Sequence, residues 1–226
     1  MANGFQYTVI FKNNSQNPGS ASLYQQNPSF DNAGMPLAWM TKYAYPTTSV
    51  SFQWQIEYGF VWSQTGVLTP GIVVAASQYW PADLTTSNQV TLTYDAQHGA
   101  FTFANQTKAS QPGSLNVVQD RTIPSNVASV GIGMAGSATY VVQAMANVNA
   151  VFTPHPEYWI AFGNYVEGEV IDVTTMNAPA QIQFPPNVYS MTAILNPDLS
   201  WTIEQTQIVN ERYVAARSLD KAVRWG

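Results

Sequence analysis

The residues with the clearest potential for chemistry are three carboxylates close together in the chain: Glu167, Glu169 and Asp172. On a strand, Glu167 and Glu169 would share one face, with side chains roughly 7 Å apart. Glycosidases use carboxyl pairs about 5.5 Å or about 6.5–9.5 Å apart that flank a scissile bond. Neighbours on one strand do not easily flank a bond, so a solvated strand face is the favoured interpretation. A weak calcium site formed with Asp172 remains an alternative.

Other catalytic and metal-binding chemistry has few candidate residues. His155 stands between two prolines, and the only second histidine for a metal site is His98, in a predicted turn. The chain has no cysteine, which excludes thiolate ligands and a thiol nucleophile. No serine has the G-x-S-x-G setting of a hydrolase nucleophile. We therefore expect a protein that is not an enzyme and that carries no cofactor or metal.

One glycine motif, Gly131 to Gly136, matches the G-x-G-x-x-G pattern of dinucleotide sites. Such a site requires a helix directly after the glycines, because the helix N-terminus holds the pyrophosphate. The run that follows, 137–142, is strand-like. We therefore predict that the glycines permit close packing of strands.

Aromatic residues supply a second kind of candidate site. The chain has 7 Trp, 12 Tyr and 10 Phe, of which many must be core. Aromatic rings that lie exposed near turns can stack on sugar rings while amides or carboxylates bind the hydroxyls. The residues predicted to be exposed, as possible sugar contacts, are Trp39, Tyr43, Tyr45, Tyr79 and Trp80.

The composition limits the partners of the protein. Only 9% of residues are charged, and 17 Asn and 18 Gln supply neutral polar groups instead. A net charge of −5 argues against nucleic-acid binding, which needs a basic surface. No apolar run approaches the ~20 residues of a membrane span, and no signal sequence is visible, so we expect a cytoplasmic location.

Alternation of apolar and polar residues predicts the elements that carry these groups. Six apolar side chains at even positions from Phe52 to Trp62 indicate one long strand, or two joined by a bend at Gly59. Shorter alternating runs begin at Tyr7, and at Val90 and Phe101 on either side of a turn at 95–99, which predicts a hairpin. Turn signals recur throughout. The pattern predicts an all-β fold, an antiparallel β-sandwich or flattened barrel, with residues 1–209 as one domain.

The last residues differ in charge from the rest. Residues 201–226 carry four cations and three carboxylates, whereas residues 1–200 carry four cations and ten carboxylates. Residues 210–226 are predicted to form a basic C-terminal helix or arm of the same domain, starting at a cap at Asn210. This arm could dock on a neighbouring copy. Its candidate assembly residues are Tyr213, Arg217, Leu219, Val223, Arg224 and Trp225.

Five stretches resemble the RhiA family of root-nodule bacteria and their bacterial relatives. They are 37–46 (LAWMTKYAYP), 52–71 (FQWQIEYGFVWSQTGVLTPG), 83–94 (DLTTSNQVTLTY), 130–136 and 152–163 (FTPHPEYWIAFG). The resemblance carries no catalytic motif, so it transfers no site residue. It implies a cofactor-free bacterial protein produced at high cell density, in a setting such as the rhizosphere.

Three functions are compatible with these features. The first is self-association as a structural protein, because a surface with few charges opposes contact between copies only weakly. With only four lysines, exposed strand edges would also be poorly protected. The second is a lectin-like carbohydrate-binding module, and the third a carboxylate-dependent hydrolase. We rank them in that order.

Overall fold

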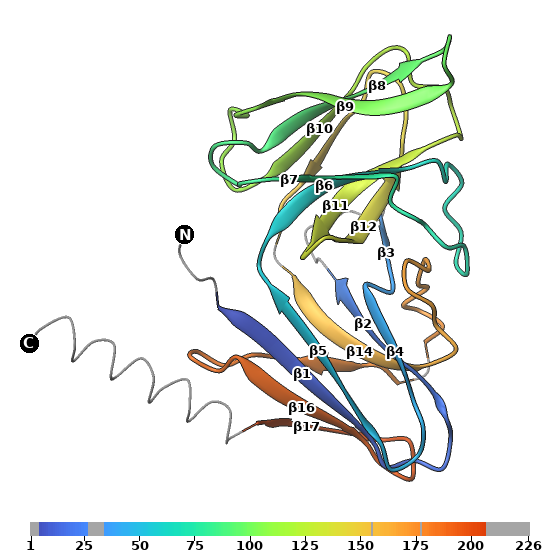
Figure 1. Ribbon diagram of the computed structural model, residues 1–226, viewed down its shortest axis with the longest axis vertical. Coiled ribbons are helices and arrows are strands. Elements are labelled where there is room, and N and C mark those ends of the chain that lie inside the picture. The colour runs from blue at the N-terminus through green and yellow to red at the C-terminus, as the bar shows by residue number, and fades with distance from the viewer. Residues whose placement is uncertain (1–4, 27–33, 155, 177, 207–226) are drawn as a thin grey trace, which may run out of the picture.

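The part of the chain that the computed structural model describes comprises residues 5–26, 34–154, 156–176 and 178–206. This part contains 17 strands in four sheets and no helix, so it also has no helix able to cross a membrane. The predicted C-terminal helix lies outside the described residues. Within them, no sheet closes on itself, and the sheets stack in two pairs (Figure 1). The all-β prediction and the sandwich are confirmed.

The lower pair of sheets encloses one hydrophobic core. Sheet A consists, in spatial order, of β17 (Trp201–Gln205), β16 (Ser190–Leu195), β1 (Gln6–Asn13) and β5 (Ser49–Gln55). Sheet B consists of β15 (Ala180–Ile182), β14 (Glu157–Gly163), β2 (Gly19–Gln26) and β4 (Met40–Ala44). The apolar side chains that alternate along β1, among them Val9 and Phe11, point into this core, as the sequence predicted. The parallel pairing of β1 with β16 brings distant parts of the chain together.

The upper pair encloses a second core. Sheet C consists of β3 (Met35–Pro36), β12 (Ser137–Gln143), β11 (Ser129–Met134), β6 (Tyr58–Ser63) and β7 (Gln78–Pro81). Sheet D consists of β13 (Asn149–Phe152), β10 (Leu115–Gln119), β8 (Gln89–Asp95) and β9 (Ala100–Thr107). Strands β8 and β9 form the predicted hairpin, and Leu92 lies opposite Phe103. That the two pairs fold as one domain stays a prediction.

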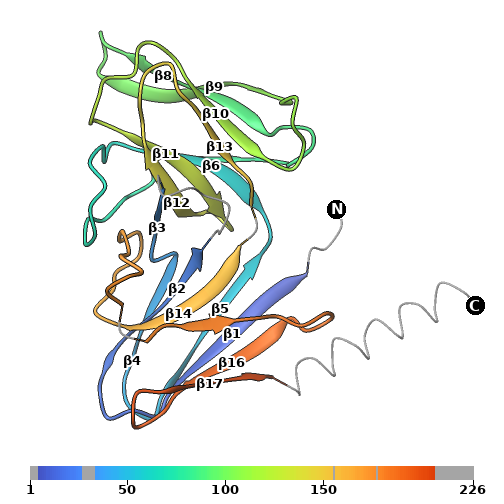
Figure 2. The same ribbon diagram turned by 180° about the vertical axis from the view of Figure 1, so that it is seen from behind.

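The aromatic run from Phe52 to Trp62 connects the two pairs (Figures 1 and 2). It forms two strands, as one of the two alternatives predicted, but the position predicted for the bend was wrong. The break falls at residues 56 and 57, where β5 leaves sheet A before β6 enters sheet C. Gly59 lies within β6 and pairs with Gly133 of β11.

The hairpin β11–β12 provides a second connection between the pairs. Ala135 and Gly136, at its tip, both have positive φ, of 52° and 86°, as a tight two-residue hairpin turn requires. Just before the turn, Met134 extends into the core between sheets A and B. The indole Nε1 of Trp39 donates a hydrogen bond to the Met134 carbonyl at 3.0 Å. The upper hairpin is therefore fixed inside the lower core.

The same hairpin explains the glycine motif. A Cβ added at Gly131 would lie 1.9 Å from the carbonyl oxygen of Tyr140 on β12, and one at Gly133 would lie 2.4 Å from that of Ser137. Real Cβ atoms do not approach backbone atoms this closely. The prediction of close strand packing is confirmed for Gly131 and Gly133, whereas Gly136 serves the turn and has open space where a Cβ would lie. A strand follows the motif where a dinucleotide site needs a helix.

Candidate functional site

The waist groove is an open hollow of about 790 Å³ beside the break between β5 and β6. We define it by the residues that line it: Ile56, Glu57, Tyr58, Tyr79, Pro81, Ala82, Asp83, Leu84, Ala135 and Gly136. They come from three parts of the chain: residues 56–58 at the strand break and the start of β6, residues 79–84 in β7 and the loop after it, and residues 135–136 at the tip of the β11–β12 hairpin. This volume is within the range of sites for small organic ligands.

In this groove the Tyr79 ring packs against two glycines, Gly59 and Gly133, that pair with each other across β6 and β11. A Cβ on Gly59 would be 2.2 Å from the Tyr79 Cζ, and one on Gly133 would be 2.9 Å from its Cε2. The ring thus lies across both strands, in space that any larger residue would fill. Its hydroxyl donates to the Glu57 carbonyl at 3.1 Å, and burial raises the pKa of Tyr79, so the hydroxyl keeps its proton. The ring is held in one orientation.

Asp83, another residue that lines the waist groove, has its side chain fixed by the turn that follows it. Its Oδ1 accepts hydrogen bonds from the N–H and hydroxyl of both Thr85 and Thr86, at 2.6–2.9 Å. These donors, the Thr85 hydroxyl first, lower the pKa of Asp83 from 3.8 to about 2. Within the described residues, its second oxygen, Oδ2, accepts none of the recorded hydrogen bonds. The carboxylate is therefore ionised and held in one orientation, and its Oδ2 can accept a hydrogen bond from a ligand.

The low pKa of Asp83 predicts how stability depends on pH. Because the folded pKa is depressed, this carboxylate stabilises the fold above pH 3.8, and the contribution disappears as the pH falls toward about 2. We expect chemical denaturation at a series of pH values to show stability falling across this window. The fall should be shallower in Asp83→Asn. An identical pH dependence in the variant and the wild type would contradict the assignment.

Four other aspartates, like Asp83, accept hydrogen bonds from groups within their own turns, which makes five such turns among the described residues. Asp172 accepts from the N–H and hydroxyl of Thr174, and Asp198 accepts in the same way from Ser200. Asp120 pairs with Thr122, and Asp95 with Gln97 and His98. Four of these five turns follow the sequence pattern Asp-x-Ser/Thr. The carboxylates of these aspartates serve local turns.

The predicted acidic cluster does not assemble. Glu167 lies in a turn, and the strand predicted for Glu167 and Glu169 was wrong, because Gly168, with φ of 81°, reverses the chain between them. Glu167 accepts from the Ser137 hydroxyl, whereas Glu169 accepts from the Val166 N–H. In the described ranges, no three His, Cys, Asp or Glu side chains group as a metal site. Glu167, Glu169 and Asp172 therefore do not converge on a calcium ion.

The predicted aromatic sugar contacts separate into three environments. Trp39 is 0% exposed, so its prediction as an exposed residue was wrong: its indole points into the lower core. Trp80 is half-buried, with its ring 5.8 Å from that of Phe103 in the upper core. Tyr43 and Tyr45 are exposed and contact each other edge to face, 5.2 Å apart. Of the five, Tyr79 lines the waist groove.

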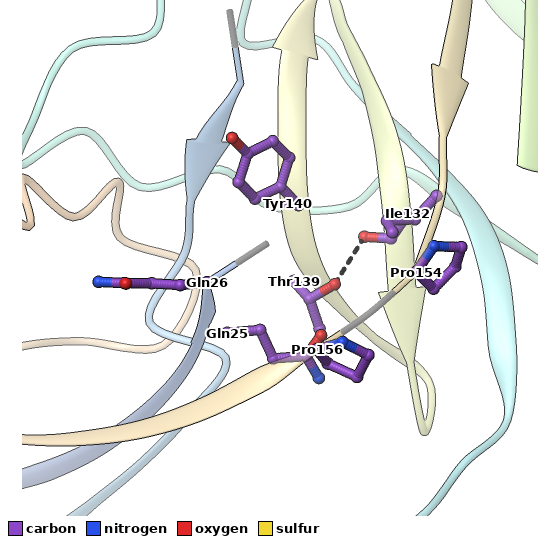
Figure 3. Close-up of a pocket in the computed structure, with 7 residues that line it drawn as sticks. All are labelled: Gln25, Gln26, Ile132, Thr139, Tyr140, Pro154 and Pro156. Carbon is purple, nitrogen blue, oxygen red and sulfur yellow. Dashed lines mark hydrogen bonds between the residues drawn. The ribbon is translucent and has the colours of Figure 1, made fainter. Parts of the chain in front are cut away.

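A second hollow, between the upper and lower pairs, is too small for an organic ligand. Figure 3 shows it among Gln25 and Gln26 of β2, Thr139 and Tyr140 of β12, and Ile132, Pro154 and Pro156. Its volume is about 10 Å³, the space of about one water molecule. The Thr139 hydroxyl is already committed to the Ile132 carbonyl at 3.2 Å. This hollow is a packing gap.

The outer face of sheet D carries little charge on its paired strands, where the charged residue is Asp95, opposite Ala100 at the end of β8. Because inward residues such as Leu92 and Val117 fill the core, their neighbours point outward. Strand register places two outward rows across all four strands, Ala104–Thr91–Val118–Asn149 and Thr107–Gln89–Asn116–Val151, although Asn116 in the second row is only 5% exposed. A third pair, Thr93 and Thr102, extends the face. The outer face of sheet A carries charges of both signs, Lys12 and Glu204.

The strand edges, in contrast, are protected by means other than several lysines. The Phe103 N–H on the edge of β9 donates to the Gln78 side chain, and Gln106 donates to the Pro81 carbonyl. Prolines lie in the edge strands β3 and β7. Lys42 donates to the Ser51 carbonyl at 2.7 Å. The expectation of poorly protected edges therefore does not hold for these strands.

Comparison with known proteins matches residues 4–206 to the RhiA family. The chain is 36% identical over 206 residues to Protein RhiA of Rhizobium leguminosarum bv. viciae, covering 90% of this chain and 88% of the relative. The chain belongs to the RhiA family. No solved structure matches it.

The RhiA match confirms the resemblance found in the sequence. All five resembling stretches fall between residues 4 and 206. The predicted assembly arm, 210–226, lies beyond both this match and the described residues, so Tyr213, Arg217, Leu219, Val223, Arg224 and Trp225 stay predictions. His155 also lies outside the described residues.

Several residues of the waist groove were missed from the sequence. Asp83, Glu57 and Tyr58 were not singled out, because no motif connects them to Tyr79. One signal was present: Asp83 begins an Asp-x-Thr turn directly after Tyr79–Trp80. A carboxylate fixed by a turn beside two aromatic residues is a pattern that sequence reasoning can use.

Proposed function

We propose that this RhiA-family protein acts without catalysis, by associating with copies of itself through the outer face of sheet D. The observation that carries the proposal is the pair of uncharged four-strand rows on that face. Threonine hydroxyls and side-chain amides both donate and accept hydrogen bonds, so they can pair with the same groups on another copy. The two rows carry no charged side chain, so like-charge repulsion between copies is limited to residues at strand ends, such as Asp95.

The general shortage of charge supports the same proposal. In the described ranges, no Lys or Arg lies within 4.0 Å of a carboxylate, and the recorded ion pair joins His98 to Asp95. Most of the surface therefore meets its surroundings through neutral groups. Val151, on the outer face, is 44% exposed and adds apolar area to the same rows.

The size of the face sets the expected strength of association. Four strands spaced about 4.8 Å apart, with about six residues each, give an area of about 400 Å² per copy. Stable specific interfaces bury about 800 Å² per partner. Association through this face alone should therefore be weak, reversible and dependent on concentration.

A non-catalytic role is supported by the use of the carboxylates. Four aspartates of the Asp-x-Ser/Thr type accept hydrogen bonds within their own turns, so these carboxylates are committed to local structure. We propose no hydrolase activity, because the acidic cluster that suggested it is spread over separate turns.

Charge placed on the proposed face tests the function. We expect Thr102→Lys/Val151→Lys, both at exposed positions, to keep the fold but to remain monomeric at concentrations where the wild type associates. The matched control is Gln53→Lys/Thr202→Lys, which adds the same charge to exposed positions on sheet A. Sedimentation velocity compares the three proteins. Association of the face variant at wild-type strength would contradict the proposal.

A separate truncation tests the predicted arm. If residues 210–226 contribute to assembly, their removal should weaken association in the same sedimentation experiment. If the face of sheet D is sufficient, the truncated protein should associate like the full chain.

A further inference from the structure

We propose that the waist groove binds the ring of a neutral saccharide, with Tyr79 as the stacking surface and Asp83 as an acceptor for its hydroxyl groups. This site goes beyond self-association and does not depend on it, because the groove lies at the break between β5 and β6, whereas the proposed association face belongs to sheet D.

The stacking surface is preformed. The Tyr79 ring is half-buried, packs against Gly59 and Gly133, and contributes to the lining of the groove. The phenol hydroxyl is tied to the Glu57 carbonyl, which also accepts the Ala135 N–H at 2.9 Å. The ring, the strand break and the hairpin tip are therefore held together, so a ligand need not order them on binding.

The acceptor is preformed as well. Four hydrogen bonds to Oδ1 fix the direction of the Asp83 carboxylate and leave Oδ2 open. An ionised carboxylate accepts hydroxyl donors more strongly than a neutral group does. Tyr79 and Asp83 line the same groove. The aromatic ring can stack on the apolar face of a sugar, and the carboxylate can accept hydrogen bonds from its hydroxyls.

The charge of the groove favours a neutral ligand over an ionic one. Two carboxylates, Glu57 and Asp83, and no Lys, Arg or His are among the lining residues, so an anionic ligand would be repelled. A cation would gain most where carboxylates converge. In the described part of the chain, however, no three His, Cys, Asp or Glu side chains group closely enough to hold a metal ion.

Isothermal titration calorimetry with the full chain tests the proposal. The probes are neutral oligosaccharides of glucose, galactose and N-acetylglucosamine, with spermidine as a cationic and polygalacturonate as an anionic comparison. We expect at least one neutral oligosaccharide to bind at micromolar to millimolar concentration. Tyr79→Ala should weaken that binding by about tenfold or more, and Asp83→Asn by about tenfold.

Two controls separate binding from folding. Tyr79→Phe keeps the ring and should retain most of the affinity, whereas Tyr43→Ala/Tyr45→Ala removes exposed rings elsewhere and should leave it unchanged. Asp83→Asn, at an exposed turn, keeps the test decisive if Tyr79→Ala unfolds. The proposal is overturned if no neutral oligosaccharide binds, if only spermidine or polygalacturonate binds, or if binding is insensitive to the Tyr79 and Asp83 substitutions.

Discussion

Replacing Trp39 with alanine should lower the free energy of unfolding by about 3–5 kcal/mol, the usual cost of removing a fully buried Trp side chain. The indole lies at the centre of the lower core, 5.2 Å from the Trp54 ring and stacked on Tyr158. It also donates to the Met134 carbonyl, at the tip of the upper hairpin. The substitution therefore removes packing in one pair of sheets and the hydrogen bond that fixes the other. Urea denaturation measures the change.

A second variant and a control make this test specific. Trp39→Phe keeps an aromatic ring but leaves the Met134 carbonyl without its donor, which should cost about 1–3 kcal/mol. Tyr43→Ala, at an exposed position, should change stability by no more than about 0.5 kcal/mol. A loss below about 1 kcal/mol in Trp39→Ala would show that this residue is not the buried connection described above.

Replacing Gly131 with alanine should cost about 3 kcal/mol, the upper end of the usual penalty for overpacking. The added methyl would lie 1.9 Å from the Tyr140 carbonyl oxygen, and this oxygen belongs to a paired strand that cannot move without breaking the β11–β12 ladder. The same substitution separates the two interpretations of the glycine motif, because the cost arises in a protein without any nucleotide.

The matched control is alanine at another strand glycine. At Gly163 of β14, the nearest atom to an added Cβ is Cε2 of the Tyr165 side chain at 3.0 Å, which can shift. We expect Gly163→Ala to change stability by less than about 1 kcal/mol, in either direction. Equal effects of the two substitutions, measured by thermal or urea unfolding, would contradict the close strand approach at Gly131.

The local elements could be predicted from the sequence, whereas their assembly could not. Alternation fixed β1 and the β8–β9 hairpin, because side chains of a half-buried strand must alternate between core and solvent. The break at residues 56 and 57 was predicted at the wrong position, Gly59, since alternation continues through it. It depends on which sheet each half joins, and that is set by long-range pairs such as β1 with β5 and β6 with β11.

The candidate site was less accessible to prediction for the same reason. Tyr79 was identified by its residue type, but its role depends on Gly59 and Gly133, which are distant in sequence and adjacent in the sheet. Trp39 was misplaced because closeness to a turn does not determine which way a side chain points. Burial of a Trp follows from tertiary contacts that a local window does not contain.

The many Asn and Gln residues serve two roles that sequence alone does not separate: some hold loops in the interior, and others lie on the surface. Asn88 is fully buried: its Nδ2 donates to the Gln111 and Ser114 carbonyls, and its Oδ1 accepts the Ala109 N–H. Asn13 bridges the turns near Asn17 and Ala44 in a similar way. These amides hold loops, whereas Asn149 lies on the exposed face proposed for association.

The most direct test of the central claim is the sedimentation of the wild-type protein over a wide range of concentration. If neutral groups on the outer face of sheet D pair with those of another copy, the weight-average mass should rise continuously with concentration and return to that of the single chain on dilution. A mass equal to one chain at every concentration, up to the limit of solubility, would contradict the account.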